Sequence, residues 1–136
     1  MAKSKTTYVD GFVLVIPNEN VDAYRKMAKM GAKIWMKHGA LDYKECIGDD
    51  LNPSMGSSEG PDGMKALTFP EMTGAAEGET VWFSFITFKS RAHRNQVNKK
   101  VMAEMNKEAE KWKDMPMPFD MQRMAYGGFK VSVSGQ

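Results

Sequence analysis

Residues 38–50, HGALDYKECIGDD, contain most of the side-chain types that carry out acid–base or metal chemistry. The segment holds a histidine, a tyrosine, a glutamate, three aspartates and the only cysteine of the chain. Whether these groups form one site depends on the helices and strands that carry them.

A metal site is not predicted in this segment, although it contains suitable ligand types. Their spacing matches no paired-ligand motif such as CxxC or HExxH. If residues 41–47 form a strand, its ends lie ~20 Å apart at ~3.3 Å per residue. His38 would then lie at one edge of the sheet and Asp49 and Asp50 at the other, so they cannot share an ion within one subunit. We expect no metal ion and no cofactor.

Acid–base chemistry is the better hypothesis for the same segment. In a strand over 41–47, Tyr43 and Glu45 point to one face and Cys46 to the other. A carboxylic acid among apolar neighbours ionises less readily and can exchange protons near neutral pH. We therefore predict His38, Tyr43 and Glu45 as candidate catalytic residues, with Glu45 or His38 as the base. The alternative is that Glu45 pairs with a lysine or an arginine.

Cys46 is the weaker candidate for covalent chemistry. A single cysteine in a strand is more often a small buried apolar residue. A reactive thiolate needs a neighbouring cation. Lys44, two residues away on the same face, leaves that option open.

A second cluster of candidates lies in KSRAHRNQVNKK, residues 89–100. Arg91 and Arg94 would occupy the first turn of a helix, where cations oppose the helix dipole unless an anion is bound. The strand order derived below brings His38, His93, Arg94 and Asp10 to one edge of the sheet. The candidate ligand-binding residues are Asp10, Arg91, His93 and Arg94, with Arg94 as the anchor of an anion. A neighbouring aspartate could equally satisfy the arginine.

Six elements must position these residues. Residues 8–16, 41–47, 80–88 and 124–133 have the β-branched and aromatic content or the alternation of strands. Helical spacing of apolar residues starts at Val21 and ends near Gly39, and it returns from Ser90 to about Lys113. Residues 48–79 hold six glycines and three prolines, which indicates a long loop, and MKALTF within it predicts a short strand or a turn. The Gly127-Gly128 pair indicates a bulge or a close backbone approach.

This βαββαβ order predicts an α+β fold in a single domain over residues 1–136. Two right-handed crossovers place both helices on one face of a four-stranded antiparallel sheet in the order 4-1-3-2, which is the ferredoxin-like plan. Strand 80–88, TVWFSFITF, is apolar on both faces. Monomers rarely expose such a patch, so we expect a homodimer through the open sheet face. The loop over 48–79 could cover that face instead.

Bulk composition excludes several classes of protein. No apolar stretch approaches the ~18–20 residues that span a bilayer. The first residues lack an apolar run followed by a small-residue cleavage site, so we expect no secretion signal. One cysteine fits a reducing compartment, so a cytoplasmic location is the default. The net charge of +2 implies no polyanionic partner, and nucleic-acid binding is retained only because some ferredoxin-like folds bind RNA. Charge is nevertheless segregated: residues 48–79 carry seven acidic groups and one lysine, whereas residues 89–113 are mainly basic.

Several segments together resemble the family catalogued as domain of unknown function 1428. The segments are YVDGFVL, DAYRKMA, HGALDYKEC, KSRAHRNQVNKKVM, MPFD and RMAYGGF. The resemblance implies a ferredoxin-like fold assembled as a dimeric α/β barrel, and it implies no activity. Residues 105–117 depart from the family pattern because extra helix precedes MPFD.

Two functions follow as expectations. The first is a homodimer with a small-molecule pocket between sheet and helices, binding a small anionic organic compound and acting, if it is an enzyme, without a cofactor. The second is a non-catalytic ligand-binding or protein-interaction module. An enclosed cavity with a polar residue favours the first, and sheet faces filled by side chains favour the second.

Overall fold

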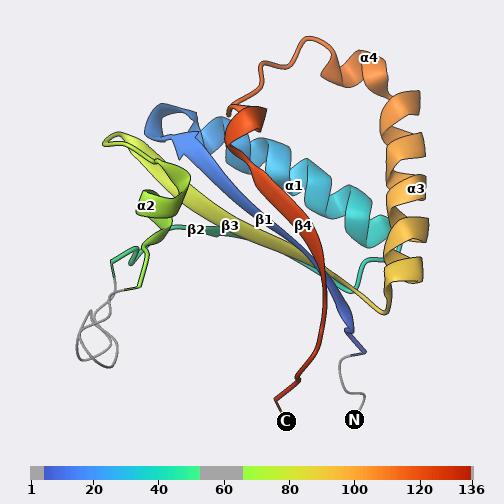
Figure 1. Cartoon of the computed structure of the whole chain (residues 1–136). Coiled ribbons are helices and arrows are strands. Elements are labelled where there is room, and N and C mark those ends of the chain that lie inside the picture. Colours follow the sequence, from blue (N-terminus) through green and yellow to red (C-terminus); the bar gives the residue numbers. More distant parts are fainter. Residues whose placement is uncertain (1–4, 53–65, 136) are drawn as a thin grey trace.

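The computed structural model describes residues 5–52 and 66–135 of the chain (Figure 1). Part of the expected loop, residues 53–65, lies outside the described residues. The larger elements are β1 (Tyr8–Pro17), α1 (Val21–Lys37), β2 (Asp42–Ile47), β3 (Glu79–Phe88), α3 (Arg91–Lys107) and β4 (Ala125–Lys130). Short helices join them: η1 (Asn18–Asn20), α2 (Phe69–Thr73), α4 (Ala109–Trp112) and η3 (Met121–Arg123).

The four strands form one antiparallel sheet in the order β2-β3-β1-β4. This is the predicted order 4-1-3-2 read from the other edge, so the α+β ferredoxin-like fold is confirmed. Asp10 pairs with Ile86 on β3 and with Gly128 on β4, while Glu45 pairs with Ser84. Because side chains alternate along a strand, all these residues point to the same face of the sheet.

Helices α1 and α3 pack on that face and divide the core into two clusters (Figure 1). One cluster contains Tyr8, Ile34, Ala40, Ile86, Phe88, Val97 and Val101, and the other contains Leu14, Ile16, Tyr24, Ala28 and Trp82. Phe12 is only partly buried and packs against both clusters. Phe12 therefore lies between the two clusters, in the space between the sheet and the helices.

The second long helix ends earlier than the sequence predicts. We expect one helix to about Lys113, but α3 stops at Lys107, and Glu108 leaves helical geometry at φ −103° and ψ 20°. Figure 1 shows α4 turned away from the axis of α3, with the following chain leading back to β4. A straight helix rises 1.5 Å per residue and would carry Trp112 away from the sheet, whereas the bend lets Trp112 pack against the first core cluster.

A short helix, α2, lies on the opposite face of the sheet, just after the segment MKALTF in which a strand or a turn is expected. Of that segment only residues 66–69 are described, and residues 66–68 form neither helix nor strand. Thr68 caps α2 by accepting a hydrogen bond from the Glu71 amide at 3.2 Å, and Glu71 accepts one from the Thr68 amide at 2.9 Å. This reciprocal pair is a capping box. Residues 68–71, TFPE, carried that signal, with proline in the first turn where it costs nothing. Across the described residues, no helix is long and apolar enough to cross a membrane.

Candidate functional site

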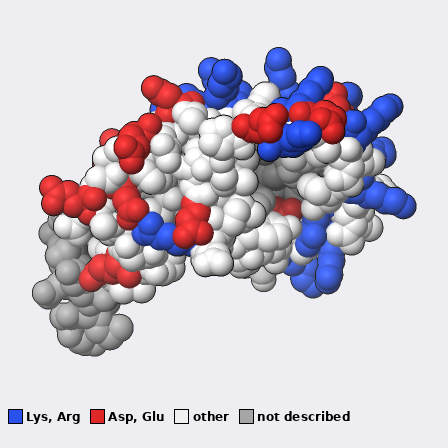
Figure 2. Space-filling model, turned by 90° about the horizontal axis from the view of Figure 1, so that it is seen from above, with Lys and Arg blue, Asp and Glu red and all other residues white. Residues whose placement is uncertain are grey.

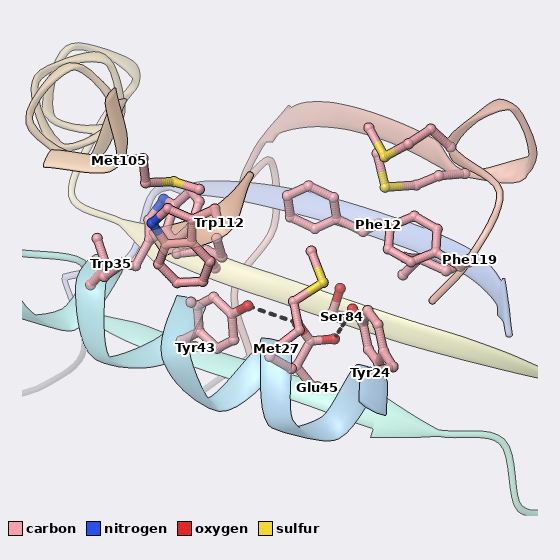
Figure 3. A pocket seen from close by; sticks show the side chains of 17 residues that line it. Phe12, Tyr24, Met27, Trp35, Tyr43, Glu45, Ser84, Met105, Trp112 and Phe119 are labelled. Atoms are coloured by element: carbon pink, nitrogen blue, oxygen red, sulfur yellow. Dashed lines mark hydrogen bonds between the residues drawn. The ribbon is translucent and has the colours of Figure 1, made fainter. Parts of the chain in front are cut away.

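A cavity of about 250 Å³ lies between the sheet and helices α1 and α4 (Figure 3). Its walls are mainly apolar, and methionines and aromatic rings provide most of the lining. The polar side chains in the lining are Tyr24 from α1, Tyr43 and Glu45 from β2, and Ser84 from β3. A mainly apolar pocket with a few convergent polar groups is the usual form of a small-molecule site.

Glu45 is the centre of the polar groups in this cavity. Its Oε1 accepts a hydrogen bond of 2.8 Å from the Tyr24 hydroxyl, and its Oε2 accepts one of 2.7 Å from the Tyr43 hydroxyl. Figure 3 shows both bonds converging on the carboxylate from opposite sides. Each carboxylate oxygen keeps a further acceptor site, so the group can bind a donor or a proton from a ligand.

The sequence left open whether Glu45 faces a cavity or a salt-bridge partner, and the structure places it in the cavity. The cavity lining contains no lysine or arginine among the described residues, and in the same part of the chain no basic side chain forms an ion pair with Glu45. Arg25 and Lys29 line a separate groove behind Glu45. Arg25 pairs with Asp22 at 3.1 Å and lies over the Trp82 ring.

Both tyrosine partners of Glu45 are held in their neutral form. Burial raises the pKa of the Tyr24 phenol far above its ordinary value, and the neighbouring Glu45 raises it further. The same two causes, in the same order, raise the pKa of Tyr43. Both phenols therefore remain hydrogen-bond donors, and Glu45 is the acceptor of the three.

A second polar cluster joins β1 to the start of α3. The Arg94 guanidinium lies over the Tyr8 ring, donates a 2.9 Å hydrogen bond from Nη2 to the Tyr8 hydroxyl, and places Nε 3.5 Å from Asp10 Oδ1. Asp10 is 1% exposed. Burial raises the pKa of Asp10, although Arg94, Asn98 and Tyr126 act in the opposite direction. Arg94 is thus occupied by a buried aspartate, one of the alternatives that the sequence left open.

Gly128, the second residue of the Gly127-Gly128 pair, makes this second cluster possible. A Cβ on Gly128 would lie 2.7 Å from Arg94 Nη2 and closer still to the Tyr8 hydroxyl. The pairing of β4 with β1 continues through both glycines without an extra residue. Of the two expectations, the pair therefore provides a close approach and not a bulge.

The side chains of His38, His93 and Arg94 each contact a different partner. His38 Nε2 lies 2.7 Å from Glu104 Oε1, which also accepts a 2.9 Å bond from Lys37. Glu104 is ten residues beyond Arg94, or ~15 Å along the helix. His93 Nδ1 accepts a hydrogen bond from the Lys89 amide and its ring packs against Phe88.

Of the seven candidate residues, Tyr43 and Glu45 line the cavity and Asp10 pairs with Arg94. His38 and His93 have other partners, as described above. Arg91 is exposed on the first turn of α3.

Sequence reasoning missed Tyr24 as a polar group of the site. Tyr24 belongs to the apolar stripe of α1, and a hydroxyl within such a stripe is the signal that could have found it, because buried phenols usually find a partner. Trp35, Trp112 and Phe119 also line the cavity, and none of them was among the candidate residues predicted from the sequence.

The other chemistry considered from the sequence concerns a metal ion and Cys46. No group of three or more histidine, cysteine, aspartate or glutamate side chains there could hold a metal ion. Cys46 is exposed on the open face of the sheet, away from Glu45. Figure 2 shows basic side chains gathered toward the α3 and α4 end of the molecule and acidic ones toward the opposite end.

The fold and this cavity define a small α+β protein with a ferredoxin-like sheet and an aromatic pocket around one carboxylate. The chain belongs to the family described as "Protein of unknown function (DUF1428)", whose model matches residues 7–121. It is similar to "Uncharacterized protein YbaA" of Escherichia coli K12 and of Shigella flexneri. Each relative is 39% identical over 128 residues, covering 93% of this chain and 97% of the relative.

Proposed function

We propose that the chain binds a small organic molecule in the cavity between sheet and helices, with Glu45 as the group that accepts a hydrogen bond or a proton from it. The single observation that carries this proposal is the carboxylate of Glu45, held by Tyr24 and Tyr43 inside an apolar cavity without a basic partner in the described residues. Glu45 is partly buried, and removing a charged group from water without a charged partner is costly. The position of Glu45 is therefore better explained by binding of a ligand than by a contribution to stability.

The cavity volume limits the ligand to a small molecule. An apolar cavity of about 150 Å³ takes up benzene, and this one encloses about 250 Å³. Drug-sized ligands occupy pockets of about 300–1,000 Å³. A ring or a branched group with a short chain therefore fits.

If the protein is an enzyme, the arrangement supports proton transfer without a cofactor. Glu45 would take a proton from an acidic C–H or O–H of the ligand and return it to another position. Tyr24 and Tyr43 stay protonated and stabilise the carboxylate before and after the transfer. A non-catalytic ligand-binding module would use the same contacts without proton transfer, and its ligand would need no acidic proton.

The test measures ligand binding and ligand hydrogen exchange on the unaltered chain and on three variants. Tryptophan fluorescence reports binding because Trp35 and Trp112 line the cavity, and a panel of small organic molecules would be screened against the unaltered chain. Ser84→Ile should fill the cavity from the sheet and abolish the response, whereas the exposed Glu19→Gln should not change it. Loss of hydrogen–deuterium exchange of a bound ligand in Glu45→Gln, with binding retained, indicates catalysis. A response that Ser84→Ile leaves intact would contradict the site.

We further propose self-association through the open sheet face. Phe83 is 45% exposed and Phe129 is 62% exposed, although both lie within strands. A second copy would cover both rings. Light scattering at micromolar concentration should give twice the chain mass of 15.3 kDa, and Phe83→Lys should lower it toward one chain. A mass of one chain for the unaltered protein would refute the dimer.

A further inference from the structure

We propose that the ligand of the cavity is an organic cation, an alkylammonium or quaternary ammonium group, with Glu45 as its counter-charge. This inference rests on the proposed small-molecule function and names the chemical class of the ligand. It differs from the anionic ligand that Arg94 suggested, because Arg94 is paired with Asp10 and is absent from the cavity lining.

The charge of the cavity is the first argument. Within the described residues Glu45 is the only charged side chain in the lining, and its hydrogen-bond partners are two phenols that remain neutral. Hydrogen bonds from neutral donors stabilise a carboxylate but do not cancel its charge. An anion brought to this group would be repelled at low dielectric, whereas a cation would supply the missing partner.

The aromatic walls are the second argument, and they are independent of the first. Six rings line the cavity: Phe12, Tyr24, Trp35, Tyr43, Trp112 and Phe119. They meet at large angles, with 42° between Trp35 and Tyr43 and 83° between Tyr24 and Phe119. Figure 3 shows these rings on several sides of Glu45. Rings set at different orientations around a cation attract it through their negative faces, and such cages recognise quaternary ammonium groups.

Two cations, Arg25 and Lys29, share a second groove with Glu45 and Tyr43 but do not line the cavity, and neither forms an ion pair with Glu45 among the described residues. Arg25 is held by Asp22 and Trp82. Four methionines of the lining, Met27, Met105, Met121 and Met124, add polarizable and adaptable surface, which suits a compact alkyl head group.

The test compares probes of one shape and three charges on the unaltered chain. The probes are choline, its uncharged isostere in which a quaternary carbon replaces the nitrogen, and the carboxylate of that same carbon skeleton. Tryptophan fluorescence and calorimetry measure each affinity. We expect choline to bind at least about tenfold more tightly than the neutral isostere, in line with a desolvated cation–π contact plus an ion pair. The carboxylate should bind most weakly.

Glu45→Gln then assigns the preference to one group. The amide has the shape of the acid but no charge, so choline should lose about tenfold in affinity while the neutral isostere changes by less than about threefold. Glu19→Gln removes an exposed charge of the same sign and should change neither. The comparison of isosteres is made on the unaltered chain, so it remains decisive if Glu45→Gln fails to fold.

Each outcome separates this inference from the proposed function. If the neutral isostere or the carboxylate binds as tightly as choline, the cation class is wrong and the small-molecule site stands. If choline binds most tightly but the Glu45→Gln variant keeps the full preference for choline over the neutral isostere, Glu45 is not the counter-charge and the inference is overturned. If none of the probes binds and the small-molecule panel is also silent, the proposed function and this inference fall together.

Discussion

Tyr43 and Glu45 lie two residues apart on β2, and the tyrosine hydroxyl donates a 2.7 Å hydrogen bond to Glu45 Oε2. Alternation along the strand places both side chains on the face under α1. Tyr24, on α1, supplies the matching bond to Oε1. One strand and one helix therefore fix both oxygens of the carboxylate. The two hydrogen bonds from the phenols set the orientation in which the carboxylate can accept a hydrogen bond from a ligand.

The two phenols should make folding stability fall at alkaline pH. Their pKa values are raised in the folded protein above the ordinary 10.0. The unfolded chain therefore releases protons first as the pH rises, and the stabilisation present below about pH 10 is lost above it. Urea unfolding between about pH 9 and pH 11 should show a steeper loss of free energy for the unaltered chain than for the double variant Tyr24→Phe with Tyr43→Phe. An equal loss of unfolding free energy with pH in the two proteins would rule out the raised pKa values of the two phenols.

Removing one hydroxyl tests how much each bond contributes at neutral pH. Tyr24→Phe leaves one oxygen of Glu45 without its donor, and a hydrogen bond to a charged group contributes about 1.5–3 kcal/mol. We expect the free energy of unfolding to fall by about that amount, measured by urea denaturation. The comparison is the same substitution made in a Glu45→Gln background, where the hydroxyl no longer faces a charged acceptor. A cost for Tyr24→Phe that is as large in that background as in the unaltered chain would contradict the arrangement.

Gly31 of α1 should couple the helix to Tyr43. A Cβ at Gly31 would lie 3.1 Å from the Tyr43 hydroxyl and 3.8 Å from the Trp35 ring. Gly31→Ala adds helix propensity of about 1 kcal/mol, but the hydroxyl must move by a few tenths of an ångström. We expect stability within about 1 kcal/mol of the unaltered chain together with weaker ligand binding. Thermal melts and fluorescence titrations on one preparation separate the two effects, and unchanged binding would show that the hydroxyl position is not critical.

Much of the fold could be predicted from the sequence, because it follows from local periodicity and crossover handedness. The strand order and the shared face of Tyr43 and Glu45 are of this kind. The end of α3 at Lys107 could not be predicted in this way, because residues 91–115 contain no proline or glycine. The bend instead allows Trp112 to pack against the core.

The site could be predicted only in part, for a similar reason. Asp10 and Arg94 meet because strand order brings their elements together. His38 turns to Glu104, which depends on the angle between α1 and α3, and no spacing in the sequence encodes that angle. Tyr24 reaches Glu45 only because of how α1 is rotated over the sheet. Such contacts between elements require the packed structure.

The two neighbouring glycines of β4 should respond differently to the same substitution. At Gly128 a Cβ would collide with Tyr8 and Arg94, so Gly128→Ala must break their contact or move β4. Overpacking of this kind costs about 1–3 kcal/mol. At Gly127 the nearest atoms are those of the Phe129 ring, at 3.6 Å and 3.7 Å, which is ordinary contact. Urea unfolding should therefore show a clear loss for Gly128→Ala and little change for Gly127→Ala, and equal losses would argue against a close approach at Gly128.

The ion pair between Glu79 and Arg123 should make the join between β3 and η3 sensitive to acid. Arg123 Nη1 lies 2.7 Å from Glu79 Oε2 and Nη2 lies 2.9 Å from Oε1, so the pair is bidentate. The hydrogen bonds from Arg123 hold the pKa of Glu79 at about 2, below its ordinary value of 4.5. A depressed carboxyl pKa stabilises the fold above the unfolded value and loses that contribution as the pH falls.

Glu79→Gln should therefore lower the urea midpoint by a constant amount above about pH 5, and the difference should shrink as the pH falls from about 4.5 toward about 2. The measurement is a series of urea melts at decreasing pH. The matched control is Glu77→Gln, which removes an exposed charge two residues away on the same segment and should change the midpoint little at any pH. A difference between Glu79→Gln and the unaltered chain that persists below about pH 2 would mean that the side chain contributes through packing and not through the ion pair.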